Sequence, residues 1–489
     1  MKVIILFLVL LFYLNPAFSN VSEYINEYTG NETYKHFSNI VKGSACISDV
    51  EKQLLIDREI QKELGTNFIY MDLDNCIKVA LGENFDIKIQ EENKQMSYWL
   101  NKNAQFSILP DVYYNFDIQD LGGEYLVGGI VSTTTHEVPI QSFLVAEWST
   151  VNQGKYFFKN IMTRNTLKSQ KANLEYTKEE IILNTILAYY SVLQKKLEIE
   201  VQKVNLYDRI EQLKYVQARF DAGIGTLYDV KRAQAELAQA RQDYIETLYD
   251  LRINQSTLAN VMGVDVEAAI YPFEISVDKR RLIDTNYDVD MLYSQALKSR
   301  EDIRAKESEI KVYNAMRNMN YTDIIPDVSV SYRNGLVGTK RAGLGKNNSI
   351  TLDVRMHLGQ NMLAGTITQI KSDSAILAAK KLELKNLMRN IKQKIIDAYY
   401  ASENALKKIE ASIEETEAAN ISFDLSLASM KAGQATYIDV IESQNIKIRA
   451  NINLIKNMIE YNKAQSRLLF ESGLITKDSA LKDYVKKFY

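Results

Sequence analysis

Proline and long apolar runs are scarce in this chain. Only five prolines occur among its 489 residues, so most segments can form long helices, which an internal proline would interrupt. Beyond the N-terminus no stretch approaches the ~18 consecutive apolar residues of a membrane-spanning helix. If the mature chain crosses a membrane, strands must do so, because lipid requires every backbone hydrogen bond to be satisfied within the protein.

Clusters of chemically reactive residues are missing as well. The histidines His36, His136 and His357 are scattered along the chain, and we interpret His357 as a strand residue that faces a lumen. No Ser/His/Asp set, Cys/His cluster or phosphate-binding glycine loop has useful spacing. A formal net charge of −3 with 25% charged residues gives no basic surface for nucleic acid. We therefore predict no enzyme activity, no cofactor, no metal site and no nucleic-acid partner.

The N-terminus is typical of an export signal. Lys2 precedes an apolar run over residues 3–14, and the sequence Pro-Ala-Phe-Ser over residues 16–19 has small residues where a signal peptidase needs them, so we expect cleavage after Ser19. Two cysteines, Cys46 and Cys76, remain in the exported chain. The exported compartment allows a disulfide, but their spacing does not fix the distance between them, so their pairing stays open.

A nine-residue motif occurs twice in the chain, 210 residues apart. Residues 222–230 read Ala-Gly-Ile-Gly-Thr-Leu-Tyr-Asp-Val, and residues 432–440 read Ala-Gly-Gln-Ala-Thr-Tyr-Ile-Asp-Val. Further matches at this offset include Gln234 with Gln444, Gln255 with Gln465, and Gly263 with Gly473. Upstream matches, such as Pro110 with Pro326, follow an offset of 216. The chain is therefore predicted to consist of two structurally equivalent halves.

A very long helical hairpin is predicted to surround each copy of the motif. Over residues 155–220, apolar side chains advance by three and four, as in a coiled coil. This seam comprises Leu183, Ile186, Tyr190, Leu193, Leu197, Val201 and Val204. Gly223 is expected to end the helix, and Thr226 to cap a return helix over residues 227–262. At ~1.5 Å per residue the first helix is roughly 100 Å long, so it must project from any compact domain.

Each half also carries a shorter helix and two strands. In the first half we expect a helix over residues 73–105 and strands near 112–118 and 140–150. In the second half we expect a helix over 290–320, strands at 327–334 and 349–358, and hairpin helices over 364–430 and 437–469. The last strand alternates most cleanly, with Ile350 and Leu352 on one face and Asp353 and Arg355 on the other. This pattern suits lipid on one side and water on the other.

Four strands per chain form a sheet with open edges, which lipid does not tolerate. Three copies would supply twelve strands, an even number within the range of outer-membrane barrels. The predicted fold class is thus mainly α with a small β part: two repeats, each of two strands and a long helical hairpin, forming a trimeric 12-stranded β-barrel continued by a 12-helix α-barrel. The predicted segments are a signal peptide (1–19), an N-terminal extension (20–70), a first repeat (71–263), a linker (264–289), a second repeat (290–473) and a C-terminal tail (474–489).

The repeated motif also carries a family resemblance over about residues 70–475. The pattern Arg219-Phe220-x-x-Gly223, followed by Asp229-Val230-x-x-Ala233-Gln234, with its second copy from Gly433 to Gln444, resembles the TolC family of outer membrane efflux proteins. The resemblance implies a homotrimeric channel-tunnel in the outer membrane that extends into the periplasm. It implies efflux or type I secretion together with a periplasmic adaptor (membrane fusion protein) and an inner-membrane pump of RND or ABC type. The channel itself would be a passive conduit in contact with outer membrane lipid.

The same resemblance assigns roles to the hairpin tips. It implies that the tips meet the adaptor, through Arg219, Gly223, Ile224, Gly225, Thr226, Gly433, Gln434, Ala435 and Thr436. It further implies a gate in which Asp439 and Glu442, one turn apart, form stacked anionic rings, while Asp229 and Tyr228 hold the closed state by polar links. The chain departs from the family pattern at Met430 and Ala435, where a tyrosine and an arginine are usual. We therefore expect the closed state to rest on packing or on other contacts.

Simpler interpretations of these residues stay open. Asp229 and Asp439 could be helix N-terminal charges that complement the helix dipole, and Gly223 and Gly433 are C-terminal caps on physical grounds alone. Two other classes of protein also remain: a periplasmic coiled-coil scaffold or adaptor without a membrane barrel, and a surface adhesin or secretion passenger with a helical stalk. Both alternatives predict that the strands of the second half face no lipid.

Overall fold

The computed structural model describes residues 57–118, 124–127, 130–133, 139–283, 288–324, 326–339, 342–355 and 364–475. The predicted signal peptide, Cys46, the three histidines and most of the C-terminal tail lie outside these residues. Among the described residues, no helix combines the length and the apolar character needed to cross a membrane.

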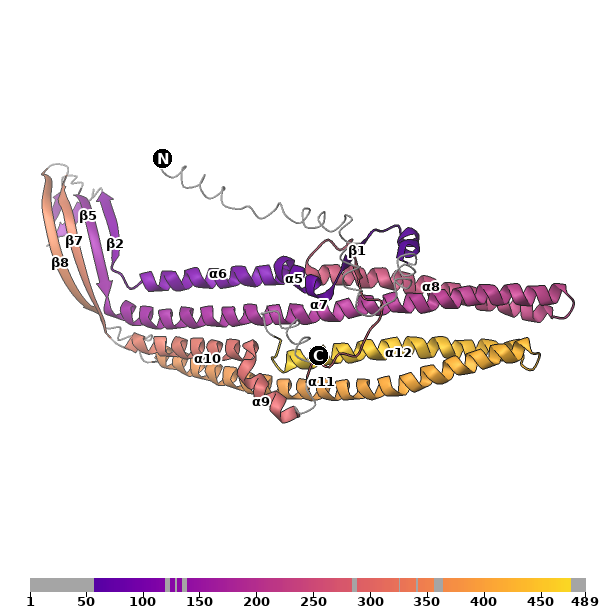
Figure 1. The fold of residues 1–489 in the computed structure, drawn as a ribbon. Coiled ribbons are helices and arrows are strands. Elements are labelled where there is room, and N and C mark those ends of the chain that lie inside the picture. The colour runs from indigo at the N-terminus through magenta and orange to yellow at the C-terminus, as the bar shows by residue number, and fades with distance from the viewer. Residues whose placement is uncertain are drawn as a thin grey trace. The chain divides into compact units, whose positions relative to one another are not determined.

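Both halves of the chain follow the same plan of short helices, strands and one long hairpin (Figure 1). The first half comprises β1 (Phe68–Met71), α5 (Leu73–Glu83), α6 (Phe85–Phe106), β2 (Asp111–Ile118), β3 (Glu124–Val127), β4 (Ile130–Thr133), β5 (Pro139–Ser149), α7 (Thr150–Asp221) and α8 (Leu227–Met262). After β6 (Ala269–Pro272), the second half comprises α9 (Val289–Ser299), α10 (Glu301–Asn320), β7 (Asp327–Thr339), β8 (Gly343–Arg355), α11 (Thr366–Lys431) and α12 (Tyr437–Glu471). The predicted fold class, mainly α with two repeated hairpins and a small β part, is confirmed.

The long hairpins end where the glycines predict. Helix α7 is 72 residues long, and Gly223 follows it with a φ of 76°, a left-handed conformation that costs glycine nothing. Thr226 caps α8 by accepting a hydrogen bond from the amide of Asp229. Gly433 and Thr436 repeat both features between α11 and α12. The two copies of the motif therefore form the same turn.

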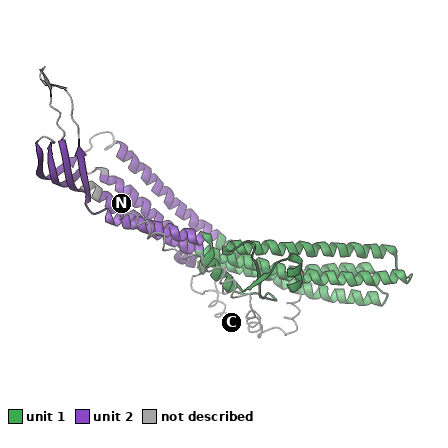
Figure 2. Ribbon diagram, turned by 90° about the horizontal axis from the view of Figure 1, so that it is seen from above, with its two compact units in different colours: residues 1–85, 178–293, 394–489 green, residues 86–177, 294–393 purple. Residues whose placement is uncertain are grey.

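The chain divides into two compact units that do not coincide with the two halves (Figure 2). One unit contains residues 86–177 and 294–393, and includes the main sheet. The other contains residues 178–293 and 394–475 of the described chain, together with residues 57–85, and includes both hairpin tips. We refer to them as the sheet unit and the tip unit.

The sheet unit carries a four-stranded antiparallel sheet in the order β2-β5-β7-β8. Directly paired residues point to the same face of a sheet, so the register defines each face. One face bears exposed apolar side chains on every strand: Val112, Tyr114, Phe116, Ile118, Leu144, Trp148, Val330, Tyr332, Leu336, Ile350, Leu352 and Val354. The opposite face bears Asp117, Gln141, Glu147, Arg333, Asp353 and Arg355. The predicted alternation is confirmed for β8, whereas on β5 the buried apolar residues Phe143 and Val145 lie on the same face as Gln141 and Glu147.

The strands of the second half are longer than predicted. β7 and β8 run through residues 335–339 and 343–348, where glycine and lysine suggested a loop. The glycines fit close approach of neighbouring strands instead, because a Cβ on Gly335 would lie 1.9 Å from the carbonyl oxygen of Ser142 on β5. Residues 356–358 of the predicted strand lie outside the described chain.

Each predicted short helix is in fact two helices. The helix expected over residues 73–105 breaks at Asn84, and the one expected over 290–320 breaks at Arg300, the repeat-equivalent position. Both residues are buried with extended backbone. Asn84 donates its side-chain amide to the carbonyl of Val261 at the end of α8, 2.8 Å away. The breaks are tertiary, since neither glycine nor proline marks them.

The tip unit also contains structure that the sequence did not predict. The N-terminal extension was expected to end near residue 70, yet residues 57–64 are helical and β1 pairs in parallel with β6, which lies in the predicted linker. Phe68 on β1 stacks on Tyr271 on β6, with ring centroids 4.2 Å apart. The extension and the linker are therefore joined into the core of this unit.

We expect the two left-handed glycines Gly223 and Gly263 to respond differently to alanine. Both have positive φ, which costs an alanine roughly 1–2 kcal/mol. At Gly263 a Cβ would also lie 2.6 Å from backbone atoms of Glu83 and Asn84, whereas at Gly223 it would meet nothing within 4 Å. Denaturant unfolding should show Gly263→Ala to be less stable than Gly223→Ala by a further ~1–3 kcal/mol. Equal losses would contradict the packing of α8 against the α5–α6 break.

Candidate functional site

The backbone of both hairpin tips is fixed by the same hydrogen bonds. At the first tip, the amide of Gly223 donates to Phe220 and that of Ile224 to Arg219. At the second, the amide of Gly433 donates to Met430 and that of Gln434 to Ser429. These bonds satisfy the carbonyls at the helix ends. The structure thus brings the tip residues predicted from the sequence together on two matching turns.

The aspartate that occurs in both copies of the motif has a local structural role. Asp229 and Asp439 each complete a capping box with the threonine three residues before them. One carboxylate oxygen of Asp439 accepts from the amide of Thr436 at 2.8 Å and from its hydroxyl at 2.7 Å. These bonds hold the pKa of Asp439 below its usual 3.8. The carboxylate therefore stabilises the cap above its unfolded pKa, and the contribution is lost only as the pH falls through the lower folded value.

The two tips differ in the side chains that they present. Ile224 at the first tip is 69% exposed, and Leu227 and Tyr228 are exposed beside it. At the equivalent positions of the second tip, Gln434 is polar, and Tyr437 is only 8% exposed. The hydroxyl of Tyr228 accepts from Arg232 on its own helix at 3.3 Å. Ile438, the equivalent of Tyr228, is 41% exposed, so the first tip presents more apolar surface than the second on the same backbone.

Below the tips, the two hairpins pack against each other through an apolar cluster. It contains Val216, Val230 and Ala233 from α7 and α8, and Phe423, Met430, Tyr437, Val440 and Ile441 from α11 and α12. Ala435 packs against its edge. Met430 and Ala435, the two departures from the TolC pattern, thus both contribute packing between the hairpins of one chain.

A buried polar layer lies beside this cluster. The guanidinium of Arg209 on α7, 2% exposed, donates to Asn445 on α12 at 2.6 Å and lies 3.9 Å from the carboxylate of Glu236 on α8. Gln212 donates to Gln444 at 2.5 Å. Burial lowers the pKa of Arg209, yet the group keeps its charge at any physiological pH. Arg209 therefore links three helices of the tip unit.

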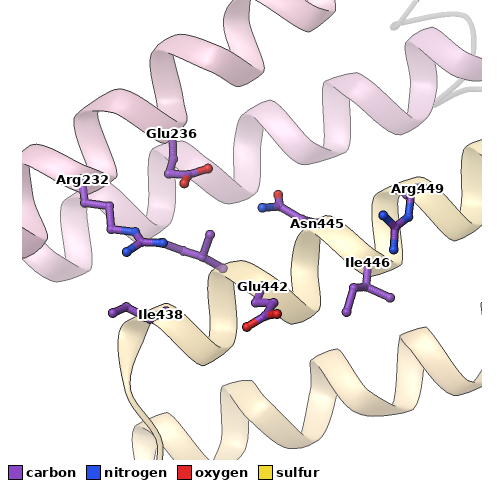
Figure 3. Close-up of a pocket in the computed structure, with 8 residues that line it drawn as sticks. Arg232, Glu236, Ile438, Glu442, Asn445, Ile446 and Arg449 are labelled. Atoms are coloured by element: carbon purple, nitrogen blue, oxygen red, sulfur yellow. The ribbon is translucent and has the colours of Figure 1, made fainter.

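A cavity of about 370 Å³ opens between α8 and α12 next to this layer (Figure 3). Its lining comprises Arg232, Glu236, Ile438, Ile441, Glu442, Asn445, Ile446 and Arg449. Glu442, one of the predicted gate residues, lines the cavity, whereas Asp439 does not. Both are exposed at the surface of the single chain. The two acids thus have different surroundings, one in a cap and one between arginines.

The polar layer around Arg209 was not predicted from the sequence. Val204 was predicted to lie in the apolar seam of α7, but it is 60% exposed, while Gln202, Lys203 and Asn205 are buried. The helix therefore turns a partly polar face toward its neighbours near the tips. A signal was present, because Gln234 and Gln444 repeat at the same offset, and Gln444 belongs to this layer.

Other reactive groups do not form a site. Among the described residues, no group of three or more histidine, cysteine and acidic side chains could hold a metal ion. Cys76 is completely buried on α5, and burial raises the pKa of its thiol. Its possible disulfide partner Cys46 lies outside the described residues, so their pairing stays open.

Comparison with known proteins identifies the family. The model of the outer membrane efflux protein family matches residues 162–264 and 292–473, once in each half. The chain belongs to the outer membrane efflux protein family. It is a channel protein of the outer membrane that serves efflux or type I secretion, and it is not an enzyme. The scaffold and adhesin alternatives are not supported.

Individual relatives are distant but cover most of the chain. The outer membrane efflux protein BepC of Brucella suis is 23% identical over 339 residues, which span 67% of this chain and 72% of BepC. The alkaline protease secretion protein AprF of Pseudomonas aeruginosa is 20% identical and covers 61% of this chain and 62% of its own. The solved structure of the CmeC channel of Campylobacter jejuni is 14% identical, with a TM-score of 0.75 over 85% of this chain and 88% of CmeC. The predicted resemblance to TolC-like proteins is confirmed.

Removing the charge of Arg209 should loosen the contact between the hairpins. We expect Arg209→Leu to destabilise the tip unit by ~1 kcal/mol, because the partly buried Glu236 loses its charged partner and the exposed Asn445 loses a hydrogen bond. Hydrogen exchange of residues 429–446 should accelerate accordingly.

A matched control is Lys214→Leu, which removes an exposed cation on the same helix that pairs only with Glu211 at 2.8 Å. Its expected cost is within ~0.5 kcal/mol. If both variants exchange at the same rate, the polar layer does not hold the hairpins together.

Proposed function

We propose that three copies of this chain form a continuous conduit: a 12-stranded β-barrel in the outer membrane, continued into the periplasm by a 12-helix α-barrel. The observation that carries the proposal is the sheet of the sheet unit. Apolar side chains are exposed on one face of all four strands, and the other face carries all the acidic side chains of these strands together with the buried Phe143 and Val145. Within the described residues, β2 and β8 have no partner strand on their outer sides. Closure with two further copies would pair these edges and place lipid outside and water inside.

The long hairpins supply the periplasmic part of the conduit. Each chain contributes α7, α8, α11 and α12, whose exposed faces carry both charged and apolar residues. We expect the apolar residues on these faces to pack against neighbouring copies and the charged ones to face water. Translocation would be passive, with energy supplied by an inner-membrane pump of RND or ABC type.

The first tip is the part best suited to a protein partner. Ile224, Leu227 and Tyr228 are exposed on a turn whose repeat equivalent presents a glutamine and buries a tyrosine. The exposure is therefore a property of these side chains, since the backbone is the same at both tips. Docking of a periplasmic adaptor at the tips, led by the first one, accounts for this apolar surface, and Gly433 to Thr436 would add polar contacts.

We place the gate of the conduit near the second tip. Three copies of Asp439 and Glu442 would form two anionic rings, which favour cations in a narrow pore. Asp229 and Tyr228 bond to their own helix within one chain, and links from them to another copy remain part of the proposal. The apolar cluster and the polar layer around Arg209 would stabilise the closed state, because Met430 and Ala435 stand where the family pattern has a tyrosine and an arginine.

The gate is tested by ion selectivity. In planar lipid bilayers, wild-type channels should prefer cations, and the double variant Asp439→Ala, Glu442→Ala should lose most of this preference, because the rings are the charge nearest the constriction. Conductance in symmetric salt should persist.

The matched control is Asp243→Ala, Glu246→Ala, which removes two acids at the same spacing from α8. This control should keep the wild-type selectivity. Equal selectivity of all three proteins would remove Asp439 and Glu442 from the constriction.

A further inference from the structure

We call the hairpin of α7 and α8 the outer hairpin and that of α11 and α12 the inner hairpin. The first end of the linker between the two repeats is bound to the outer hairpin. Lys196 on α7 is 1% exposed and donates to the carbonyls of Pro272 and Glu274, both at 3.0 Å. Its ammonium also lies 4.6 Å from the ring centre of Tyr271. Tyr189, seven residues before Lys196 on α7, donates its hydroxyl to the carboxylate of Glu274. Residues 271–274 are therefore held on α7 by buried hydrogen bonds, in addition to the pairing of β6 with β1.

The second end of the described linker is fastened to the inner hairpin. The side-chain amide of Asn462 on α12 accepts from the amide of Arg280 at 2.8 Å and donates to the carbonyl of Asp278 at 2.9 Å, as an adjacent strand would. Three residues later, the side-chain oxygen Oε1 of Gln465 accepts from the backbone amides of Leu282 and Ile283 at 3.0 and 3.2 Å. Gln465 also donates to Ser402 on α11 at 2.6 Å. Residues 278–283 are thus held by both helices of the inner hairpin.

The same position in the first repeat makes no such contacts. Gln255 is the repeat equivalent of Gln465 and is completely buried, yet neither its side-chain nitrogen nor its oxygen has a hydrogen-bond partner. A buried glutamine is therefore present in both repeats, but only in the second does it bind a strap of backbone. The contrast shows that the contacts of Gln465 belong to the linker and are not a general requirement of the fold.

We propose that the linker is a short tether that sets how far the inner hairpin can move from the outer one. Only Ile275, Ser276 and Val277 separate the two anchored segments. A fully extended chain from Glu274 to Asp278 spans at most roughly 14 Å. Both anchors and the parts of both hairpins that lead to the tips lie in the tip unit. Beyond this separation, the hairpins can part at the level of the tether only if buried hydrogen bonds break.

The tether makes this level the fixed point of any movement of the inner hairpin. From Asn462 to the tip at Thr436, α12 extends roughly 40 Å at ~1.5 Å per residue. The tip can therefore swing away from the outer hairpin by breaking the apolar cluster, while the tethered end stays in place. This inference rests on the proposed gate near the tip, and it assigns the linker the role of restraining that gate.

Lengthening the tether tests its role in the full-length protein. Insertion of about six glycine and serine residues between Ser276 and Val277 adds a flexible segment. In planar bilayers we expect this variant to raise the open probability on the order of tenfold, the factor that ~1.4 kcal/mol of lost restraint produces. The same insertion between Thr285 and Asn286 adds the same segment after the second anchor, and it should leave the wild-type open probability.

A pair of point variants provides an independent measurement should either insertion impair assembly. Gln465→Met removes the hydrogen bonds to Leu282, Ile283 and Ser402, so it should raise the open probability in the same direction. Gln255→Met removes two unpaired polar atoms, so it should leave gating unchanged and thermal stability undiminished.

The outcomes separate the tether from the channel itself. If wild-type protein passes ions but the variants at 276–277 and Gln465 gate like their controls, the tether is refuted while the channel stands. If wild-type protein passes no ions, the proposed conduit is refuted, and with it the restraint on its gate.

Discussion

The proposed architecture depends on one constraint: lipid offers no hydrogen-bond partners to the edge strands of a small sheet. A backbone amide or carbonyl without a hydrogen-bond partner in hydrocarbon costs several kcal/mol, and in the part of the chain that the structure describes β2 and β8 are the edge strands of the sheet. The apolar side chains that cover one face of this sheet would be unfavourable in water and belong in lipid. One chain cannot satisfy both requirements, whereas a closed ring of copies can. The proposed water-filled conduit depends on that closure.

The tip unit meets a different requirement under the proposed gate, in which its two hairpins hold together in the closed state and separate in the open one. Two sets of contacts join them near the tips. One is the apolar cluster around Met430 and Val440, and the other is the polar layer around the buried Arg209. The linker adds a short covalent restraint, anchored by Lys196 on one hairpin and by Asn462 and Gln465 on the other. Packing near the tip with anchoring farther along the helix is an arrangement that concentrates movement at the tip.

Sequence reasoning succeeded where a local rule decides the structure. The left-handed glycines Gly223 and Gly433, the threonine caps after them and the alternation of β8 were predicted, because turns and sheet faces depend on neighbours in sequence. Prediction from the sequence was wrong where contacts between residues far apart in the chain determine the local structure. Neither Asn84 nor Arg300, where the helices break, is a glycine or proline: Asn84 binds the end of α8, and Arg300 lies over the ring of Tyr176 on α7. Gly335 by its residue type indicates a loop, yet in the structure it lies in β7 and allows β5 to approach closely. The seam of α7 was extended to Val204, although buried polar partners shift the face of the helix near the tip.

The most direct test of this account is the molar mass of the full-length protein, extracted from outer membranes in mild detergent and measured by light scattering with the detergent contribution subtracted. Self-association of three copies predicts a protein mass three times that of one mature chain, together with ion conductance after reconstitution of the same fraction. A monomeric protein mass, with no conductance, would contradict the claim that the sheet closes by the addition of copies.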